Sequence, residues 1–419
     1  MNNTIKLAVA AALLAGASSA NAGIMIPAGD WTLDIGGIVN SYYTHTNTSG
    51  DAVTVIGGAT ENGDESQNNI TTGLLPNYLS VSGKTRQNDL DVGFTISINP
   101  GSSTTNSGLQ NGNPQGSSFS GNQENRQAFL TFGDKSWGSI KVGKDLGIYA
   151  SDAILNDMTL LGVGSAAGGL AGNTTTLGRI GTGFMYADWK SQIAYSSPNW
   201  NGFSFTAGVT QAWNTYGAAQ IDDEDGVFGS ARSVGRGGSQ PAFEGKASYE
   251  WAGDFGGKVW VSGISQKIDQ LTNAAGDDLG SDRANAWDIG ATVNVAGFGL
   301  TGYYGQGKGT GTTVQFRDGY DALGNDRDSD DWYVQGTYTI PGAGTKLGVS
   351  YGESTLDGNT GEFDEYQNSM WTVGAYHPIT KHLNLVAEYS NAKSEVKVPG
   401  PGDVDGKSKT ISLGAILFF

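Results

Sequence analysis

The residue types that most often carry catalysis are scarce in this chain. It has no Cys, which removes thiol chemistry, and its three His residues show neither metal-ligand nor catalytic-triad spacing. They are His45, His377 and His382, and the last two flank a predicted turn. Residues 297–302 read GFGLTG, which matches a dinucleotide-binding fingerprint by letter, but a strand pattern follows where that fingerprint needs a helix. The sequence therefore predicts no enzyme, no cofactor and no metal centre.

An acidic run at residues 326–331 is the remaining candidate for ion binding. It reads DRDSDD and has Asp at alternate positions, as calcium-binding loops do, but it lacks their turn Gly and their distal Glu. A solvated loop is the favoured interpretation, and ion binding stays open as the alternative.

One long segment, residues 144–189, interrupts the regular pattern of the chain. It lies between two strand patterns but has no sustained period of its own, is rich in Gly and Ala and contains four Asp residues. Loops of this length inside an ordered domain are usually functional or disordered. We expect the neighbouring strands to form a ring and this segment to fold into it, narrowing a water-filled hole.

The rest of the chain is dominated by strands with one apolar and one polar face. In residues 89–99, for example, Leu, Val, Phe and Ile at every second position alternate with Asp, Gly, Thr, Ser and Asn. This period of two predicts a β-strand. Sixteen such strands are predicted, at residues 31–43, 74–84, 89–99, 125–133, 137–144, 192–197, 203–212, 242–251, 257–266, 285–295, 298–308, 330–340, 345–353, 370–377, 383–393 and 409–419.

The connections between these strands alternate between short and long. Turns such as 85–88 and 296–297 are short, whereas 44–73, 100–124, 144–189, 213–241 and 309–329 are long. Short turns on one side and long loops on the other are typical of an all-β, antiparallel transmembrane barrel, with the turns periplasmic and the loops extracellular. Residues 144–189 are then the third long loop. An aromatic girdle is expected from tryptophans at strand ends, namely Trp31, Trp137, Trp213, Trp251, Trp287, Trp332 and Trp371.

The N-terminal residues are expected to be a cleaved export signal. Lys6 precedes an apolar run at residues 7–17, and residues 20–22 (ANA) form a small-residue cleavage site. Residues 1–22 are then a signal peptide and residues 23–419 the barrel. Removal of Lys6 takes the formal charge from −17 to −18. Such an acidic chain disfavours binding to nucleic acid or to anionic lipid, which need clustered Lys and Arg.

Several stretches resemble bacterial outer-membrane porins. The ending KTISLGAILFF resembles the porin C-terminal strand, and residues 125–147 resemble the fourth and fifth strands. GIYASDAILNDM, at 147–158, resembles the start of the constriction loop, and residues 192–209 resemble the strand–turn–strand that follows it. The resemblance implies a sixteen-stranded, usually trimeric channel in the outer membrane. Its implied partners are small hydrophilic solutes and ions, membrane lipid and lipopolysaccharide, and the barrel assembly machinery that reads Phe419.

The resemblance also implies the residues of the pore constriction. Acidic residues on the porin loop face a ladder of arginines on the opposite wall. Asp152 and Asp157 match the loop pattern, and Arg126 and Arg179 match two of the ladder arginines, with Lys190 as a further basic candidate.

Three positions complicate this assignment. Leu161 stands where a loop Glu is common in the family, and Tyr78 stands where a third arginine is common. Alternation also places Arg126 on the apolar face of its strand, whereas the resemblance places it in the lumen. We favour the lumen, because Arg on the lipid face at mid-bilayer costs ~2–4 kcal/mol.

The sequence thus predicts a passive outer-membrane pore with a mild preference for cations. The acidic run at residues 222–225 adds to the negative charge on which this preference rests. Two alternatives remain open: a substrate-specific channel that uses aromatics such as Tyr149 and Trp189 as a sugar slide, and a structural or adhesive surface barrel.

Overall fold

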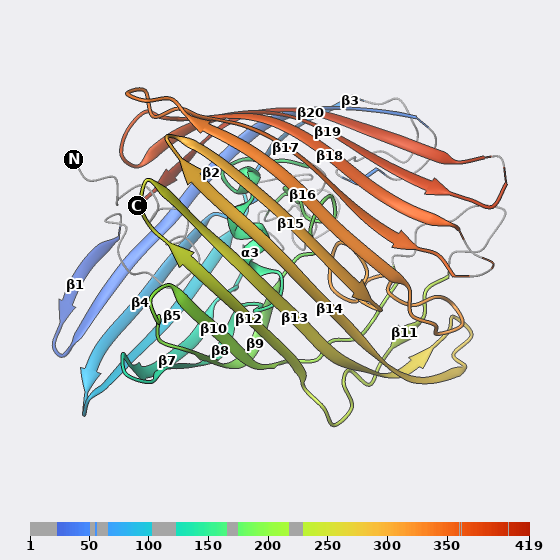
Figure 1. Ribbon diagram of the computed structural model, residues 1–419, viewed down its shortest axis with the longest axis horizontal. Helices are drawn as coiled ribbons and strands as arrows, with labels where there is room; N and C mark the ends of the chain where they lie inside the picture. The colour runs from blue at the N-terminus through green and yellow to red at the C-terminus, as the bar shows by residue number, and fades with distance from the viewer. Residues whose placement is uncertain are drawn as a thin grey trace, which may run out of the picture.

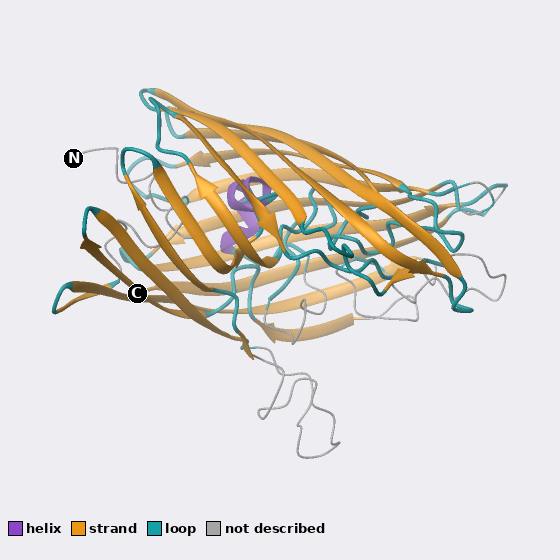
Figure 2. Cartoon of the chain, turned by 90° about the horizontal axis from the view of Figure 1, so that it is seen from below, coloured by secondary structure: helices purple, strands orange, loops and turns teal. Residues whose placement is uncertain are grey.

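The fold is a single antiparallel sheet closed into a barrel (Figures 1 and 2). The computed structural model describes residues 23–50, 55–56, 66–102, 123–165, 175–217, 229–359, 361, 363–400 and 402–419. Closure is made by β2, which pairs with β4 on one edge and with the last strand, β20, on the other. The sixteen barrel strands are β2 (Trp31–Gly50), β4 (Tyr78–Gln87), β5 (Leu90–Pro100), β7 (Ala128–Asp134), β8 (Gly138–Leu146), β9 (Trp189–Ser196), β10 (Phe203–Thr210), β12 (Ala242–Trp251), β13 (Phe255–Thr272), β14 (Asp278–Val295), β15 (Phe298–Lys308), β16 (Asp328–Thr339), β17 (Lys346–Asp357), β18 (Glu365–Pro378), β19 (Leu383–Lys397) and β20 (Val404–Phe418). The predicted barrel and its strand number are confirmed.

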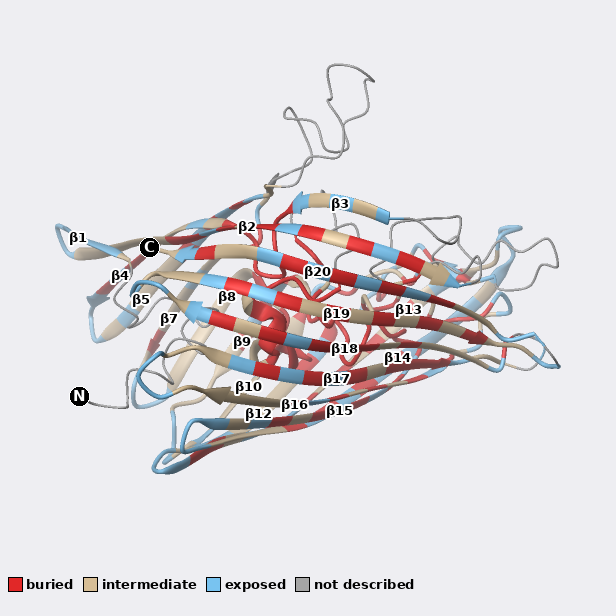
Figure 3. Ribbon diagram, turned by 90° about the horizontal axis from the view of Figure 1, so that it is seen from above, coloured by how far each residue is buried: buried red, intermediate tan, exposed pale blue. Residues whose placement is uncertain are grey.

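The two faces of the barrel follow the predicted period of two. Buried and more exposed residues alternate along much of the barrel, for example along β15 and β20 (Figure 3). On β20, the apolar Ile411, Leu413 and Leu417 point outward and are about half exposed, while Thr410 and Ser412 point inward and are buried. Small polar residues inside and large apolar residues outside suit a barrel that lipid surrounds and water fills.

Four short strands supplement the barrel. They are β1 (Ile24–Ala28), β3 (Ser66–Thr71), β6 (Gln123–Glu124) and β11 (Arg232–Ser233). β1 pairs with β2 from Trp31 to Ile35, just beyond the point where β20 ends beside Ile38. The N-terminal strand therefore covers the part of the β2 edge that the C-terminal strand leaves open.

Several strands extend beyond their predicted bounds on the long-loop side. β13 and β14 were expected at 257–266 and 285–295 but run to Thr272 and from Asp278, so only five residues connect them. Apolar alternation marks only the part of a strand that needs an apolar outer face. Backbone pairing continues past it, where the outward residues are polar, as Lys267 and Arg283 are, and the pattern gives no signal there.

Two other expectations were wrong in detail. Residues 74–77 were expected to open the second strand, but β4 begins at Tyr78, and Leu74 and Leu75 are buried against the barrel interior. Trp213 was expected in the aromatic girdle, but it lies inside, where both its backbone N–H and its carbonyl pair with the Gln266 amide at 2.9 and 2.8 Å. Trp287 and Trp371 do point outward, at 45% and 38% exposure.

The C-terminus completes the closing ladder. Gly37 and Phe419 exchange two backbone hydrogen bonds of 2.8 and 3.0 Å. Both neighbours of Gly37 lie very close to it. A Cβ on Gly37 would collide with the carbonyl oxygen of Tyr78 and would lie 2.7 Å from the Phe419 ring. Glycine is therefore required at position 37 by packing.

The closure predicts a specific assembly defect. We expect Gly37→Val to lower the refolded fraction strongly, because its side chain collides with the Tyr78 carbonyl oxygen of β4 and with the Phe419 ring. The matched control is Gly302→Val, since a Cβ at the outward-facing Gly302 of β15 meets nothing within 4 Å. The refolded fraction is measured as the band that migrates fast on an unboiled gel. Equal fractions for the two variants would contradict the role of Gly37 in closure.

Candidate functional site

The candidate site is the loop between β8 and β9, called the inward loop here, whose described residues, 147–165 and 175–188, lie inside the ring of strands (Figure 2). It contains α3 (Ser151–Asn156) and the 3₁₀-helix η2 (Met158–Leu161). Asp157 separates the two helices: its extended backbone ends α3, and its side chain accepts a hydrogen bond from the Thr159 N–H at 3.1 Å. This capping satisfies an N–H that a helix start leaves free.

Two glutamates on the barrel wall hold the two ends of the described helical part. Glu244 of β12 accepts hydrogen bonds from the backbone N–H groups of Ile148 and Tyr149, at 2.8 and 2.9 Å. Glu388 of β19 does the same for Val163 and Gly164, at 2.7 and 2.9 Å. Each carboxylate thus satisfies two successive amides that the loop backbone cannot pair itself.

Residues from other strands hold the middle of the loop. The Tyr333 hydroxyl donates to the Ala153 carbonyl at 2.9 Å. The Gln335 side chain accepts from the Met158 N–H at 2.6 Å and donates to the Asn156 carbonyl at 3.0 Å. These contacts place the loop against β12–β19 and make it a fixed part of the lumen.

Asp152 lies on α3 and pairs with two wall lysines. Its carboxylate is 3.1 Å from Lys246 Nζ and 2.6 Å from Lys258 Nζ. Burial acts to raise the pKa of Asp152, but the two lysines outweigh it and hold the pKa below its usual range. Both lysines keep about a quarter of their side chains accessible, at 28% and 22%, whereas Asp152 is almost fully covered. At this point the lysines face the open lumen.

Asp157 and Arg179 are brought together, but not across an open pore. Arg179 was expected on the opposite wall, yet it lies in the returning arm of the inward loop itself. Its Nε is 3.9 Å from Asp157 Oδ1, and its Nη1 donates to the Met370 carbonyl at 2.9 Å while Nη2 donates to Ser350 Oγ. Both charged groups are buried, so this pair ties the two arms of the loop to each other and to β17 and β18.

Arg126 is on the inner side, as the resemblance implied. β7 begins only at Ala128, so the residues before it are free of the strand alternation that had placed Arg126 outside. Its Nε is 2.6 Å from Glu124 Oε2, and its guanidinium lies over the Trp189 ring at 5.7 Å. The described contacts group Arg126 with the end of the inward loop rather than with Asp152 or Asp157.

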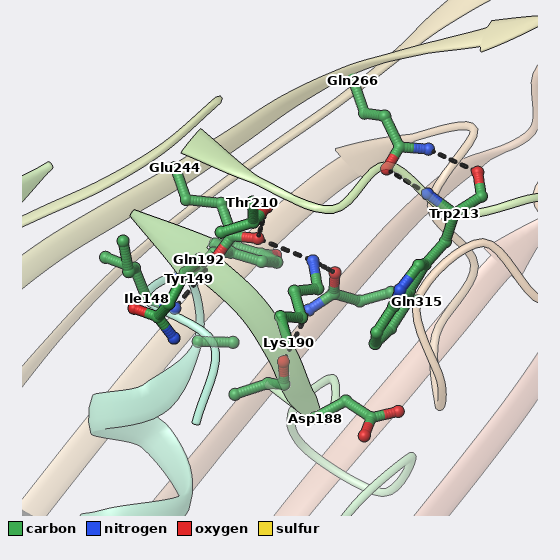
Figure 4. Close-up of polar contacts among 12 residues, drawn as sticks. Ile148, Tyr149, Asp188, Lys190, Gln192, Thr210, Trp213, Glu244, Gln266 and Gln315 are labelled. Carbon is green, nitrogen blue, oxygen red and sulfur yellow. Dashed lines mark hydrogen bonds and ion pairs between the residues drawn. The ribbon is translucent and has the colours of Figure 1, made fainter. Parts of the chain in front are cut away.

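Lys190 is buried in the wall behind the loop (Figure 4). Its Nζ lies 2.6 Å from Glu244 Oε1 and donates to Gln315 Oε1 at 2.5 Å. It also lies over the Trp213 ring at 4.7 Å. Lys190 therefore neutralises the glutamate that holds the start of the inward loop, and it does not line the open pore.

A second loop, residues 309–327 between β15 and β16, also folds inward. The Gln315 amide donates to the carbonyls of Tyr186 and Ala187, both at 3.2 Å, and the Tyr186 N–H donates to the Thr313 carbonyl at 2.9 Å. Phe316 and Tyr320 are fully buried. Sequence reasoning treated this stretch as an ordinary long loop, because it carries no apolar period. Its sequence signal was a concentration of Gly and Thr beside the aromatics Phe316 and Tyr320.

The residues that the inward loop partly exposes differ from those predicted to line the constriction. Its half-buried residues include Leu155, Asn156, Leu161 and Asp188. Tyr149 is only 1% exposed, so it has no surface on which a passing sugar would slide, whereas Trp189 is half-buried.

No helix among the described residues is long and apolar enough to cross a membrane. Within the same residues, no three His, Asp or Glu side chains gather closely enough to hold a metal ion. Residues 328–331 of the acidic run belong to β16, and the run at 222–225 lies outside the described residues.

The anchoring by Glu388 is testable. Glu388→Ala leaves the amides of Val163 and Gly164 without their acceptor, at ~1–3 kcal/mol each. We expect the inward loop to detach at that end, which single-channel recordings would report as increased open-channel noise and altered conductance. Glu388→Gln is the matched control, because its amide oxygen still accepts from both N–H groups. Recordings of Glu388→Ala that match the wild type would contradict the anchoring.

Comparisons with known proteins agree with this architecture. A family model described as Gram-negative porin matches residues 8–396. The fold is similar to the outer membrane channel DcaP of Acinetobacter baumannii, with a TM-score of 0.62 at 16% identity, covering 95% of this chain and 100% of that one. It is also similar to an anion-selective porin from Comamonas acidovorans, with a TM-score of 0.58 at 16% identity over 93% of this chain and 100% of that one.

A third similar structure is the trimer form of OmpT from Vibrio cholerae. Its TM-score is 0.55 at 14% identity, and the match covers 93% of this chain and 99% of that one. No curated protein sequence matches the chain significantly. Because the family model spans most of the sequence, the chain belongs to the Gram-negative porin family and is a non-enzymatic outer-membrane diffusion channel.

Proposed function

We propose that the protein is a general porin through which small hydrophilic solutes and ions diffuse passively, with a mild preference for cations. The observation that carries this proposal is the inward loop, which wall side chains hold in the lumen of a sixteen-stranded barrel. Sixteen strands leave an aqueous channel, and a loop fixed inside it sets the narrowest section. The formal charge of −18 after loss of Lys6 supports the cation preference.

The constriction is proposed to comprise Asp152, Asp157, Arg126, Arg179 and Lys190, in two roles. Arg179 with Asp157 and Lys190 with Glu244 are buried pairs that fix the position of the loop. Asp152, through its two lysines, and Arg126, beside Trp189, set the field that an ion meets. Lys246 and Lys258 therefore oppose the acidic character of the whole chain, which is why the proposed preference is mild.

Membership of the porin family also supports proposals for how the chain is processed and assembled. Residues 1–22 are proposed to be removed on export, leaving residues 23–419 as the barrel. The mature chain is proposed to form a homotrimer in contact with lipid and lipopolysaccharide, and the trimer form of OmpT supports the trimer. Phe419 is proposed as the signal for the barrel assembly machinery, and its position at the closing ladder supports this role.

A substrate-specific channel is the second candidate function. The observation that favours it is the second inward loop, since Gln315 and Thr313 join it to the end of the first loop and add a further layer to the lumen. Among the residues that the structure describes, no comparable feature favours an adhesive surface barrel.

Conductance in planar bilayers tests the proposed function. A general porin gives ohmic conductance that rises with salt and that added sugars do not block. Saturating conductance with block by one solute class would favour the specific channel, and absence of conductance from a folded barrel would overturn both.

Ion selectivity tests the charge assignment. A unit charge ~8 Å from the ion path changes the ion's energy in water by ~0.5 kcal/mol, or about twofold in permeability ratio. We expect Asp152→Asn to shift the reversal potential toward anions, and Lys258→Gln or Arg126→Ala to shift it toward cations. Asp157→Asn and Arg179→Ala act in the same respective directions but more weakly, because their side chains are buried. Raising the salt concentration should reduce every shift through screening. Unchanged reversal potentials in all five variants would place the constriction elsewhere.

A further inference from the structure

The outer surface of β8–β14 carries an apolar groove. β10, β12, β13 and β14 lie at the front in Figure 1. The groove has a volume of about 840 Å³. Its floor is a row of small residues in register across three adjacent strands, Ala207, Gly245 and Gly263. Large apolar side chains that point outward flank this row, namely Ile193, Tyr195, Val209, Phe243 and Trp287.

The packing and backbone conformation of the chain do not explain why glycines occupy this floor. A Cβ at Gly245 would meet only one atom within 4 Å, the Thr206 carbonyl oxygen at 3.7 Å. A Cβ at Gly263 would have its nearest neighbour at 3.2 Å, and neither residue has a left-handed φ. Packing and backbone conformation would thus permit larger residues at Gly245 in particular. The missing side chains leave room for a molecule outside the barrel.

The groove ends in a polar and basic rim on the long-loop side. Directly past the small-residue row, Ser265 pairs in register with Asn285. Arg283 lies one step further, where its Nη1 donates to Ser265 Oγ at 3.2 Å and its Nη2 donates to Gln240 Oε1 at 2.6 Å. Lys267 is the register partner of Arg283, so two basic residues sit side by side above the groove.

Arg283 differs from the other basic residues at this rim. Lys267 is 2.6 Å from Asp269, and Lys308 is 2.8 Å from Asp328. Within the part of the chain that the structure describes, no carboxylate lies within 4.0 Å of the Arg283 guanidinium. An exposed guanidinium without a counter-charge is suited to bind phosphate, which it recognises with a planar fork of N–H donors.

We propose that this groove binds a lipid with a phosphate-bearing head, whose acyl chain lies over Ala207, Gly245 and Gly263 and whose phosphate contacts Arg283. The net charge of the chain disfavours anionic lipid in general, so the interaction depends on the local arrangement of an apolar groove beneath Arg283, whose partners are neutral side chains. The inference rests on the proposed placement of the long-loop side in the outer leaflet. It does not depend on the channel itself.

Native mass spectrometry of the full mature barrel in a non-ionic detergent tests this proposal. The probes are dipalmitoyl phosphatidylglycerol and dipalmitoylglycerol, which share their acyl chains, and only the first carries a phosphate. One basic residue at a membrane surface contributes about fivefold in affinity for an anionic head. We therefore expect Arg283→Gln to weaken phosphatidylglycerol binding about fivefold while leaving dipalmitoylglycerol binding unchanged, and Gly245→Leu to weaken both by filling the groove.

Matched controls separate the possible outcomes. Gly302→Leu adds the same side chain at an outward-facing glycine of β15 with nothing within 4 Å, and should bind lipid as the wild type does. Wild-type lipid binding by Gly245→Leu would overturn the proposal. A change of oligomeric state in Gly245→Leu instead of lipid loss would assign the groove to a second copy of the chain and also overturn it. Conductance of the groove variants should stay at the wild-type value, so a failure of the channel proposal would be distinguishable.

Discussion

The fold depends on one constraint, which is that a sheet in lipid must leave no backbone amide unpaired. The chain meets this constraint by pairing its first barrel strand with its last, from Ile38 beside Phe418 to Gly50 beside Gly406. The seam is finished by the Gly37–Phe419 exchange and by β1, which covers the remaining edge of β2. Once the ring is closed, the inner face is free to be polar, and this polar inner face in turn accepts a loop.

The backbone groups of the inward loop likewise need hydrogen-bond partners inside the barrel. A folded segment without long helices carries many backbone groups that need partners. The wall supplies these partners from side chains, chiefly Glu244, Tyr333, Gln335 and Glu388. The position of the inward loop is thus set by residues on strands far apart in sequence. This arrangement explains why buried charged groups are frequent in a channel lumen: several of them hold backbone in place and do not face the solute.

The sequence predicted the barrel well because lipid imposes a period of two on every strand. It predicted strand ends poorly where the strands leave the apolar band, as at β13 and β14. For the site, the motif around Asp152 and Asp157 correctly located the inward loop, but not the partners of its charges. Arg179 was assigned to the wall because a motif gives positions along the chain and not the path of the backbone. The lysines that pair with Asp152 and the second inward loop had no local signature, since both depend on contacts between distant segments.

The central claim is that the inward loop forms the narrowest part of a conducting lumen. The chain has no native Cys, so a single introduced thiol can be modified selectively. Leu155 lies on α3 with its side chain half-buried, whereas Leu413 points outward from β20. A methanethiosulfonate reagent added to an open channel should lower the single-channel conductance of Leu155→Cys and leave that of Leu413→Cys unchanged. Conductance that stays constant after verified modification of Leu155→Cys would contradict the account.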